Sequence, residues 1–374
     1  MESRKKILLL YSYSNQRHLI DAIVEHSSCD DYKLSAIDVS DWSYTAGNNE
    51  TPYIFKFLKN IRRNKLISFV GYKIFQQFLK REVMKYDAVD INAFMPSHYT
   101  TLDYLIKNGI PYKISFWGSD LYRASDAEMQ KKKYYLDHAK IVQVETPIVK
   151  NDLLSRVSVN EDKIVIANYG INMLNTIDEV RKEPAFTSNK NDKIVITCGY
   201  NGAGGQQHKK MIEAIKAIEV NLKNQIKIYL PMTYGIQAEE YVIDIEKELQ
   251  NAGVDYKILR KRLSEHELAL LRLQTDIALN IQITDSFASS IIEHLYAGSI
   301  VLAGDWLPYD FFYEKGITYF KTSLEDITQN LNVIIPNIEK YKSECLNNKD
   351  NVFMLSSWKY LAKIHISNYQ KLIE

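Results

Sequence analysis

Two acidic residues, Asp285 and Glu293, flank a run of small side chains in the stretch DSFASSIIEHLYAGSIVLAG. We expect a helix to begin near Ser286, with free N–H groups at its N-terminus facing an anion such as a phosphate. Asp285 can then accept hydrogen bonds from sugar hydroxyls, and Glu293, further along the helix, can hold both hydroxyls of a ribose. The pattern indicates a site for a sugar and a ribose. A capped helix with one glutamate at its buried edge remains the alternative.

A glycine-rich turn, CGYNGAGGQQHKKMIEAI, lies between a predicted strand and a predicted helix. Gly202 and Gly204 allow the backbone to approach a pyrophosphate closely. His208 and Lys209 follow in the first turn of the helix, where they can neutralise a diphosphate leaving group, with Lys210 as the alternative to Lys209. A dinucleotide-binding turn is the competing interpretation. It is disfavoured because the glycines fall as G-x-x-G-x-G-G and no acidic residue ends the next strand.

Two further candidates for chemistry lie in the first half of the chain. Asp120, in ISFWGSDLYR, follows a predicted strand, and it can orient or deprotonate an acceptor hydroxyl or cap the next turn. His98, in FMPSHY, also follows a strand, with a purely structural role as its alternative. We predict no metal site, because no DxD motif stands in a supporting strand context and Asp30 and Asp31 are expected in a solvated loop.

A basic and aromatic stretch covers residues 52–85, with nine Lys and Arg residues against one acid, Glu82. Such an amphipathic region can lie on an anionic membrane surface. A pair of core-packing helices with a solvated face is the alternative. Nucleic acid is not expected as a partner, since no nucleic-acid-binding module accompanies the stretch and the formal net charge is only +1.

The composition describes an ordinary globular chain, with 46% hydrophobic and 25% charged residues among 374. This length favours two domains. The three cysteines show no zinc-binding spacing and fit a reducing compartment. The apolar run after the first basic residues is too short for a secretory signal, and no run of about 18 apolar residues occurs. We therefore expect a cytoplasmic protein, with peripheral association at the inner face of the plasma membrane as an open possibility.

Short β-rich apolar runs alternate with amphipathic stretches, which is typical of parallel sheets with crossover helices. The expected strands cover 5–11, 32–38, 87–94, 112–117, 140–145 and 162–168 in the first half, and 192–199, 225–231, 254–259, 275–281 and 299–304 in the second. The expected helices of the second half cover 206–220, 237–251, 264–273 and 287–297, with Ser264 and Glu267 forming a capping box. The sequence thus predicts an α/β fold of two Rossmann-like domains that face each other across a cleft.

The domain boundaries follow from the same pattern. We assign 1–175 to an N-terminal acceptor-binding domain and 190–350 to a C-terminal nucleotide-sugar-binding domain. The polar stretch 179–192 is the expected linker, because it lacks an apolar period and contains a proline. Residues 351–374 are expected to form a C-terminal helix that packs back toward the N-terminal domain.

The motifs resemble those of known sugar-transferring enzymes. Asp285-x7-Glu293 followed by LYAGSIVLAG is similar to the E-x7-E segment of glycosyltransferase family 4 and related GT-B enzymes, with Asp where that family usually has Glu. KIVIANYGIN is similar to their crossover between domains. ISFWGSDLYR and YLPMTYG resemble segments of bacterial 4-acetamido-4,6-dideoxygalactosyl (Fuc4NAc) transferases, which lack the acidic pair. Both likenesses imply transfer from a nucleotide sugar, but the first family retains the anomeric configuration and the second inverts it.

The resemblance implies a glycosyltransferase that moves a sugar from a nucleotide diphosphate sugar to a glycan or lipid-linked acceptor in bacterial cell-surface polysaccharide synthesis. It implies no cofactor or metal beyond the donor substrate, and the acidic pair favours retention. The expected catalytic residues are Asp120, His98 and Asp285. The expected donor-binding residues are Gly202, Gly204, His208, Lys209, Ser286, Phe287, Ala288 and Glu293. A non-catalytic nucleotide-sugar-binding protein and a nucleotide-sugar epimerase of the same fold remain alternatives.

Overall fold

The computed structural model describes residues 4–12, 17–46, 51–61, 65–184 and 192–374. The chain divides into two compact units. The first unit contains residues 1–170 together with 358–374, and the second contains residues 171–357. Each unit has its own sheet, so each is described by itself.

The sheet of the first unit has the strand order β3-β2-β1-β4-β5-β6-β7. All neighbouring strands are parallel except β2 and β3, which form an antiparallel pair at one edge. The order changes direction between β1 and β4, which makes this the topological switch point. The strands are β1 Lys5–Tyr11, β2 Tyr32–Asp38, β3 Ser43–Ala46, β4 Ala88–Asn92, β5 Tyr112–Ser115, β6 Ile141–Val144 and β7 Ile164–Ile166.

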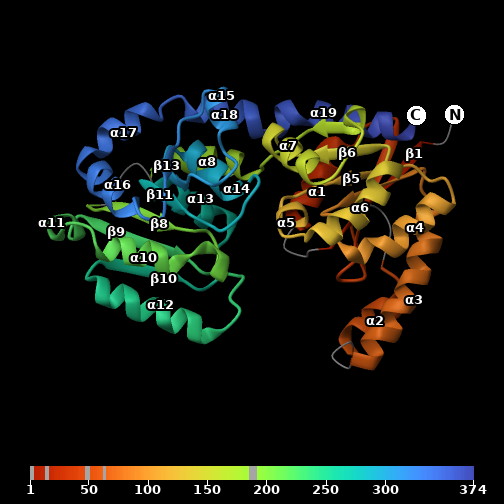
Figure 1. Ribbon diagram of the computed structural model, residues 1–374, viewed down its shortest axis with the longest axis horizontal. Helices are drawn as coiled ribbons and strands as arrows, with labels where there is room; N and C mark the ends of the chain where they lie inside the picture. The colour runs from red at the N-terminus through yellow and green to blue at the C-terminus, as the bar shows by residue number, and fades with distance from the viewer. Residues whose placement is uncertain (1–3, 13–16, 47–50, 62–64, 185–191) are drawn as a thin grey trace. The chain divides into compact units, whose positions relative to one another are not determined.

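Helices accompany this sheet in the chain order expected for a Rossmann-like unit, in red to yellow in Figure 1 with the C-terminal helix in blue. They are α1 Arg17–Ser27, α2 Tyr53–Ile61, α3 Lys65–Val83, α4 Tyr99–Lys107, α5 Ser119–Tyr122, α6 Asp126–His138, α7 Pro147–Arg156 and α19 Trp358–Ile373. The inner strands β1 and β4 are buried almost throughout, as a sheet covered on both faces requires.

Helix α19 is held to the first unit by apolar and polar contacts. Tyr369 and Trp358 belong to the same buried apolar cluster as Ile7 and Leu9 of β1. The ring of Trp358 stacks on His26 of α1 at 5.0 Å between centroids. The C-terminal segment is therefore an integral part of the first unit.

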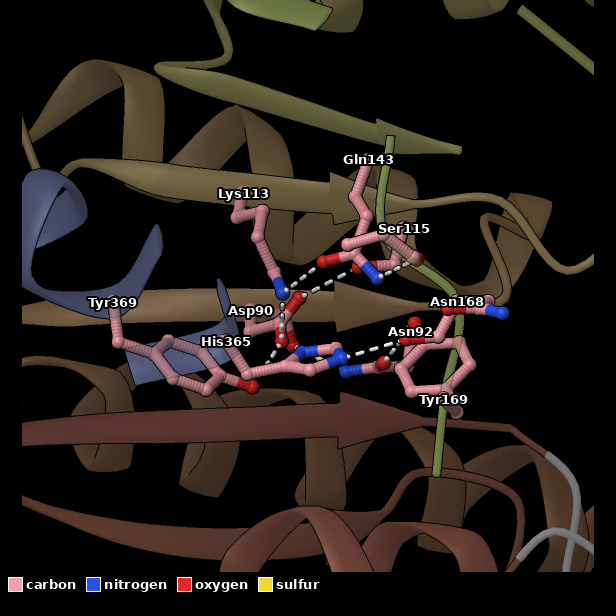
Figure 2. Close-up of polar contacts among 10 residues, drawn as sticks. Asp90, Asn92, Lys113, Ser115, Gln143, Asn168, Tyr169, His365 and Tyr369 are labelled. Atoms are coloured by element: carbon pink, nitrogen blue, oxygen red, sulfur yellow. Dashed lines mark hydrogen bonds and ion pairs between the residues drawn. The ribbon is translucent and has the colours of Figure 1, made fainter. Parts of the chain in front are cut away.

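A buried ion pair lies under α19, and Figure 2 shows its partners converging from three strands and the helix. Lys113 of β5 lies 2.9 Å from Asp90 of β4 and donates to Gln143 of β6 at 2.9 Å. Tyr369 of α19 donates to Asp90 at 2.8 Å, and Ser115 donates to the other carboxylate oxygen at 3.2 Å. Every charged atom thus has a partner, which a buried ion pair needs to be tolerated. We call these five residues the α19 cluster.

The sheet of the second unit is parallel throughout, with the order β10-β9-β8-β11-β12-β13. Its switch point lies between β8 and β11, and its interior is a cluster of Ile, Leu, Val and Met side chains. The strands are β8 Ile194–Cys198, β9 Ile226–Pro231, β10 Asp255–Leu259, β11 Ile277–Asn280, β12 Ile300–Gly304 and β13 Phe320–Thr322.

The second unit has one helix before its first strand, further helices between the strands, and others after the last strand (Figure 1). They are α8 Met173–Arg181, α10 His208–Lys216, α11 Val220–Lys223, α12 Glu239–Ala252, α13 Glu265–Gln274, α14 Ser289–Ala297, α15 Phe311–Glu314, α16 Ile327–Ile334, α17 Ile338–Glu344 and α18 Asn348–Ser356. The capping box expected at Ser264 and Glu267 is present at the start of α13.

Three details differ from the sequence-based expectations. The chain passes between units at Gly170 rather than within 179–192, since α8 already packs on α13 and α14 of the second unit. Residues 185–191 of that expected linker lie outside the described residues. The helix expected over 351–374 is two helices that break at Ser357, where the backbone is extended.

Candidate donor site

The loops that follow β8 and β11 flank the switch point of the second unit. Ligands of doubly wound sheets bind at this position, outside the carboxyl ends of the strands. The glycine-rich turn, residues 199–207, follows β8, and the loop 281–288 follows β11. They are joined directly, because the backbone N–H of Ile283 donates to the carbonyl of Gly205 at 2.9 Å. The sheet thus brings together the two segments that the sequence singled out.

One half of the glycine-rich turn, at Gly202, packs against a neighbouring loop, and the other half, at Gly204 and Gly205, is open. A Cβ atom at Gly202 would lie 2.4 Å from Ile236, so close packing against the loop after β9 requires glycine there. The N–H of Gly202 also donates to the carbonyl of Tyr234 in that loop at 2.7 Å. A Cβ atom at Gly204 or Gly205 would meet nothing within 4 Å. The open half is therefore the part of the turn that leaves room for a diphosphate.

The structure changes the expected role of His208 and Lys209. His208 is fully buried and its Nδ1 lies 3.0 Å from the hydroxyl of Tyr241. Burial lowers the pKa of His208 to about 4, so the ring is neutral near pH 7 and carries no charge toward a phosphate. Lys209 is exposed and pairs with Asp244 of α12 at 3.2 Å. The alternative, Lys210, pairs with an acid one turn along its own helix.

Asp285 lies in the loop before α14, half-buried and held by neighbouring groups. Its carboxylate accepts hydrogen bonds from Gln282 at 2.8 Å, from the backbone of Ser286 at 2.9 Å, and from the hydroxyl of Tyr309. Burial raises the pKa of the Asp285 carboxyl, and these three hydrogen bonds oppose that rise. The side chain is fixed in one orientation and keeps limited room for a further partner.

The helix after Asp285 begins later than expected. Helix α14 begins at Ser289 with Ala288 as its N-cap, three residues beyond Ser286. The intervening side chain of Phe287 is 9% exposed and packs on Phe311 and Phe312, so it belongs to the core of the unit. Ser286 is buried as well, at 3% exposed, whereas Ala288 is half-buried.

Glu293 lies on α14 and is 7% exposed. Its Oε2 accepts from Nε of Arg272, a buried residue of α13, at 2.9 Å. Arg272 also donates from Nη1 to Nε2 of His294 at 3.0 Å, and burial together with the charge of Arg272 holds the pKa of His294 well below its usual value. Arg272 therefore orients Glu293, leaving Oε1 for another partner.

One feature of the sequence indicates the pair of Arg272 and Glu293. Arg272 stands within the apolar run LALLRLQ, where an unpaired guanidinium would be costly to bury.

The pKa of Tyr234, in the loop after β9, reflects its burial and the charges of Glu293 and Arg272. Burial, the largest effect, and the Glu293 carboxylate raise the pKa of Tyr234, whereas Arg272 and Arg262 oppose that rise. Arg272 of α13 and Arg262 of the loop before it thus bring positive charge near Tyr234.

The switch point of the first unit carries the other two predicted residues. Asp120 is 1% exposed, and its carboxylate accepts from the N–H groups of Phe94 at 2.7 Å and Trp117 at 2.9 Å. Burial raises its pKa to about 6 in spite of these hydrogen bonds. The carboxylate ties the loop after β4 to the loop after β5.

His98 lies in the loop after β4 and points toward the end of β1. Its Nδ1 accepts from the N–H of Met95 at 3.3 Å, and its Nε2 lies 3.0 Å from the hydroxyl of Ser12. Burial lowers the pKa of His98 to about 4, so the neutral ring carries its proton on Nε2 and donates it to Ser12. Ser12 in turn lies 3.1 Å from the hydroxyl of Ser97. The hydroxyls of Ser12 and Ser97 therefore lie side by side at this switch point.

Comparison with known proteins relates part of the chain to a family of sugar-transferring enzymes and the whole chain to a known fold. The model of the family described as 4-alpha-L-fucosyltransferase, glycosyl transferase group 56, matches residues 106–279, which is less than half of the chain. No curated protein matches the sequence. The chain has a GT-B fold. The solved structures described next share that fold, which confirms the fold class expected from the sequence.

Three solved structures illustrate the likeness of this chain to GT-B proteins. HepE of Anabaena, solved in complex with UDP-glucose, is 13% identical over 98% of this chain and 99% of its own, with a TM-score of 0.71. Sucrose-phosphate synthase of Thermosynechococcus elongatus is 14% identical over 99% of both chains, with a TM-score of 0.74. A glycosyltransferase of Rickettsia africae is 15% identical over 100% of this chain and 99% of its own, with a TM-score of 0.73. At these identities the likeness shows the fold.

The predicted site residues lie in two places, one in each unit. The glycine-rich turn, Asp285 and Glu293 lie at the strand ends of the second unit, whereas Asp120 and His98 lie at those of the first. Within the described ranges, no helix is long and apolar enough to cross a membrane. No group of three or more His, Cys, Asp or Glu side chains suited to a metal ion occurs among the same residues.

Proposed function

We propose that the protein is a glycosyltransferase that binds a nucleotide diphosphate sugar at the strand ends of its second unit and transfers the sugar to a glycan or lipid-linked acceptor. The observation that carries the proposal is the placement of Asp285 and Glu293 on either side of the start of α14, beside the open half of the glycine-rich turn. The UDP-glucose complex of HepE supports a donor of this class. We further propose a role in bacterial cell-surface polysaccharide synthesis.

Each part of the donor has a partner in this proposal. Glu293, oriented by Arg272, holds the ribose hydroxyls through its remaining carboxylate oxygen. The backbone of Gly204 and Gly205 faces the diphosphate, with positive charge from Arg262 and Arg272 in place of Lys209. Asp285 accepts a hydrogen bond from a hydroxyl of the transferred sugar. Fixed donors and charges of this kind stabilise the negative charge that develops on the leaving diphosphate, so we propose that turnover needs no metal.

We propose transfer with retention of the anomeric configuration. A single displacement inverts the configuration and requires a base that takes the proton of the acceptor hydroxyl. Both oxygens of Asp120 already accept backbone hydrogen bonds, and Nδ1 of His98 does as well. We therefore propose that neither residue is that base, because both are buried and hydrogen-bonded within the protein. We assign Asp120 and His98 to positioning the acceptor-side loops and the hydroxyl of Ser12.

Helices α2 and α3 supply a surface for a lipid-linked acceptor at an anionic membrane. Phe55 and Phe75 pack in the core of the first unit, whereas Phe57 and Phe69 are 53% and 59% exposed. Basic side chains, Lys73 among them, share the exposed side, and aromatic and basic residues together favour the interface of an anionic bilayer. We propose peripheral binding at the inner face of the plasma membrane through this surface. Residues 62–64 of the predicted stretch lie outside the described residues.

A turnover assay tests the proposed transfer. The protein is incubated with UDP-, GDP- and dTDP-glucose, each with and without EDTA, and the release of nucleoside diphosphate is measured with and without membrane lipid extract. We expect slow release with one donor alone, faster release with lipid extract, and no effect of EDTA. A rearranged nucleotide sugar from donor alone would instead indicate an epimerase. The anomeric configuration of the product, read by NMR, tests retention.

Vesicle binding tests the membrane surface separately. We expect the protein to sediment with phosphatidylglycerol vesicles and not with phosphatidylcholine vesicles, and the double variant Phe57→Ser, Phe69→Ser to lose that binding. Equal sedimentation of the variant and the unchanged protein would contradict the proposed surface.

A further inference from the structure

An exposed aromatic ring stands next to the proposed donor site. Trp306 follows the last residue of β12 by two positions and is 40% exposed, although the strand before it is fully buried. Its six-membered ring lies against Gly304, where a Cβ atom would come within 2.5 Å of the ring. One face of the indole is therefore seated on the backbone at the carboxyl end of the sheet, and the exposed part of the ring is available to a ligand.

A chain of hydrogen bonds fixes this ring relative to Asp285. The indole Nε1 donates to the carbonyl of Gln282 at 3.0 Å, and the side chain of Gln282 donates to Asp285 at 2.8 Å. Ile283, the next residue in the same loop, is 59% exposed and extends the apolar surface. The site thus combines a carboxylate that is held in place with an aromatic ring that is held in place.

Sugars have both surfaces that this combination fits. A pyranose ring presents hydroxyls at its edge and C–H groups on its faces, so it is bound by polar groups together with aromatic rings. We propose that Trp306 is a platform for the C–H face of the donor's sugar ring while Asp285 accepts a hydrogen bond from one of its hydroxyls. This inference rests on the proposed function. It names a specificity-determining residue, since the platform contacts the sugar and leaves the nucleotide untouched.

The test compares a nucleotide sugar with its own diphosphate. UDP-, GDP- and dTDP-glucose and the three corresponding diphosphates are titrated calorimetrically into the unchanged protein, and the tightest pair is carried to the variants. Trp306→Ala is expected to weaken binding of the nucleotide sugar by about fivefold, the value of a typical aromatic stacking contact. The same variant is expected to leave the affinity for the diphosphate within roughly twofold, because the sugar alone touches the ring.

Two further variants separate the ring from its hydrogen bond. Trp306→Phe keeps an aromatic face without the N–H donor and is expected to retain most of the affinity. Gly304→Ala keeps the indole but places a Cβ atom against it, so the ring must move and the affinity for the nucleotide sugar should fall as in Trp306→Ala. Ile243→Ala, at an exposed apolar side chain of α12, is the control and should change neither affinity.

The possible results distinguish a failure of the Trp306 platform from a failure of the proposed donor site. Equal losses for diphosphate and nucleotide sugar in Trp306→Ala, or no loss for either, would overturn the platform and leave the proposed function standing. Phe behaving like Ala would assign the effect to the hydrogen bond with Gln282 and would also overturn it. Failure of the unchanged protein to bind any of the six compounds would instead contradict the proposed function.

Discussion

Replacing Lys113 by methionine is expected to lower the free energy of unfolding of the first unit by about 3 to 5 kcal/mol. This loss of stability is expected because Asp90, the partner of Lys113, would stay buried without its counter-charge. Asp90 is fully buried, and without the ammonium group 2.9 Å away its carboxylate would keep only the hydroxyls of Ser115 and Tyr369. The loss is measured as a shift of the denaturant midpoint, followed by tryptophan fluorescence and by circular dichroism.

Two other variants show whether charge or packing causes the effect. The double variant Asp90→Leu, Lys113→Met removes both charges and should recover most of the lost stability, since an apolar pair replaces an ionic one. Lys133→Met removes an exposed ion pair with Asp137 one turn along α6 and should cost less than about 1 kcal/mol. A Lys113→Met protein as stable as Lys133→Met would contradict the importance given to the α19 cluster.

Replacing Glu293 by glutamine is expected to weaken binding of the preferred nucleoside diphosphate by at least about tenfold, the value of a hydrogen bond to a charged group. The glutamine amide has nearly the same shape, so the change removes the charge that Arg272 orients. Asp285→Asn should give a different result. We expect its affinity for the diphosphate to be unchanged, and its turnover to fall by about a hundredfold, because Asp285 meets the sugar. Calorimetry gives the affinities and diphosphate release gives the turnover.

A matched carboxylate of the second unit provides the control. Glu183 pairs with His266 at 2.9 Å on the surface, so Glu183→Gln should alter neither affinity nor turnover. Thermal unfolding shows whether each variant remains folded, above all Glu293→Gln, which changes the partner of the buried Arg272 guanidinium. A Glu293→Gln protein that is fully folded and binds the diphosphate normally would remove the ribose assignment.

The strands could be predicted from the sequence because their apolar runs are short, buried and bounded by polar loops. The two that were missed, Ser43–Ala46 and Phe320–Thr322, lie at sheet edges, where partial exposure removes the apolar signal. The start of α14 was predicted three residues too early because Ser286 resembles an N-cap, whereas its backbone N–H is taken by Asp285. The hydrogen bond from the backbone of Ser286 to Asp285 cannot be recognised from the local sequence pattern.

The candidate site could be predicted only in part, for a similar reason. The glycine spacing and the two acids mark loops after neighbouring strands, and the parallel sheet brings such loops together. The partners of Lys209 and Glu293 depend on α12 and α13, which are distant in sequence, so spacing alone could not show that Lys209 is engaged by Asp244. The role of Trp306 could not be predicted from the sequence, because it depends on the packing of the indole ring against Gly304.

Hydrogen exchange measured with and without the preferred nucleoside diphosphate tests the central claim most directly, because it reports which backbone amides a ligand protects. We predict that protection concentrates in peptides that cover 199–207 and 281–293 of the second unit. Protection confined to peptides of the first unit, or spread evenly with none at these two segments, would contradict a donor site at the strand ends of β8 and β11.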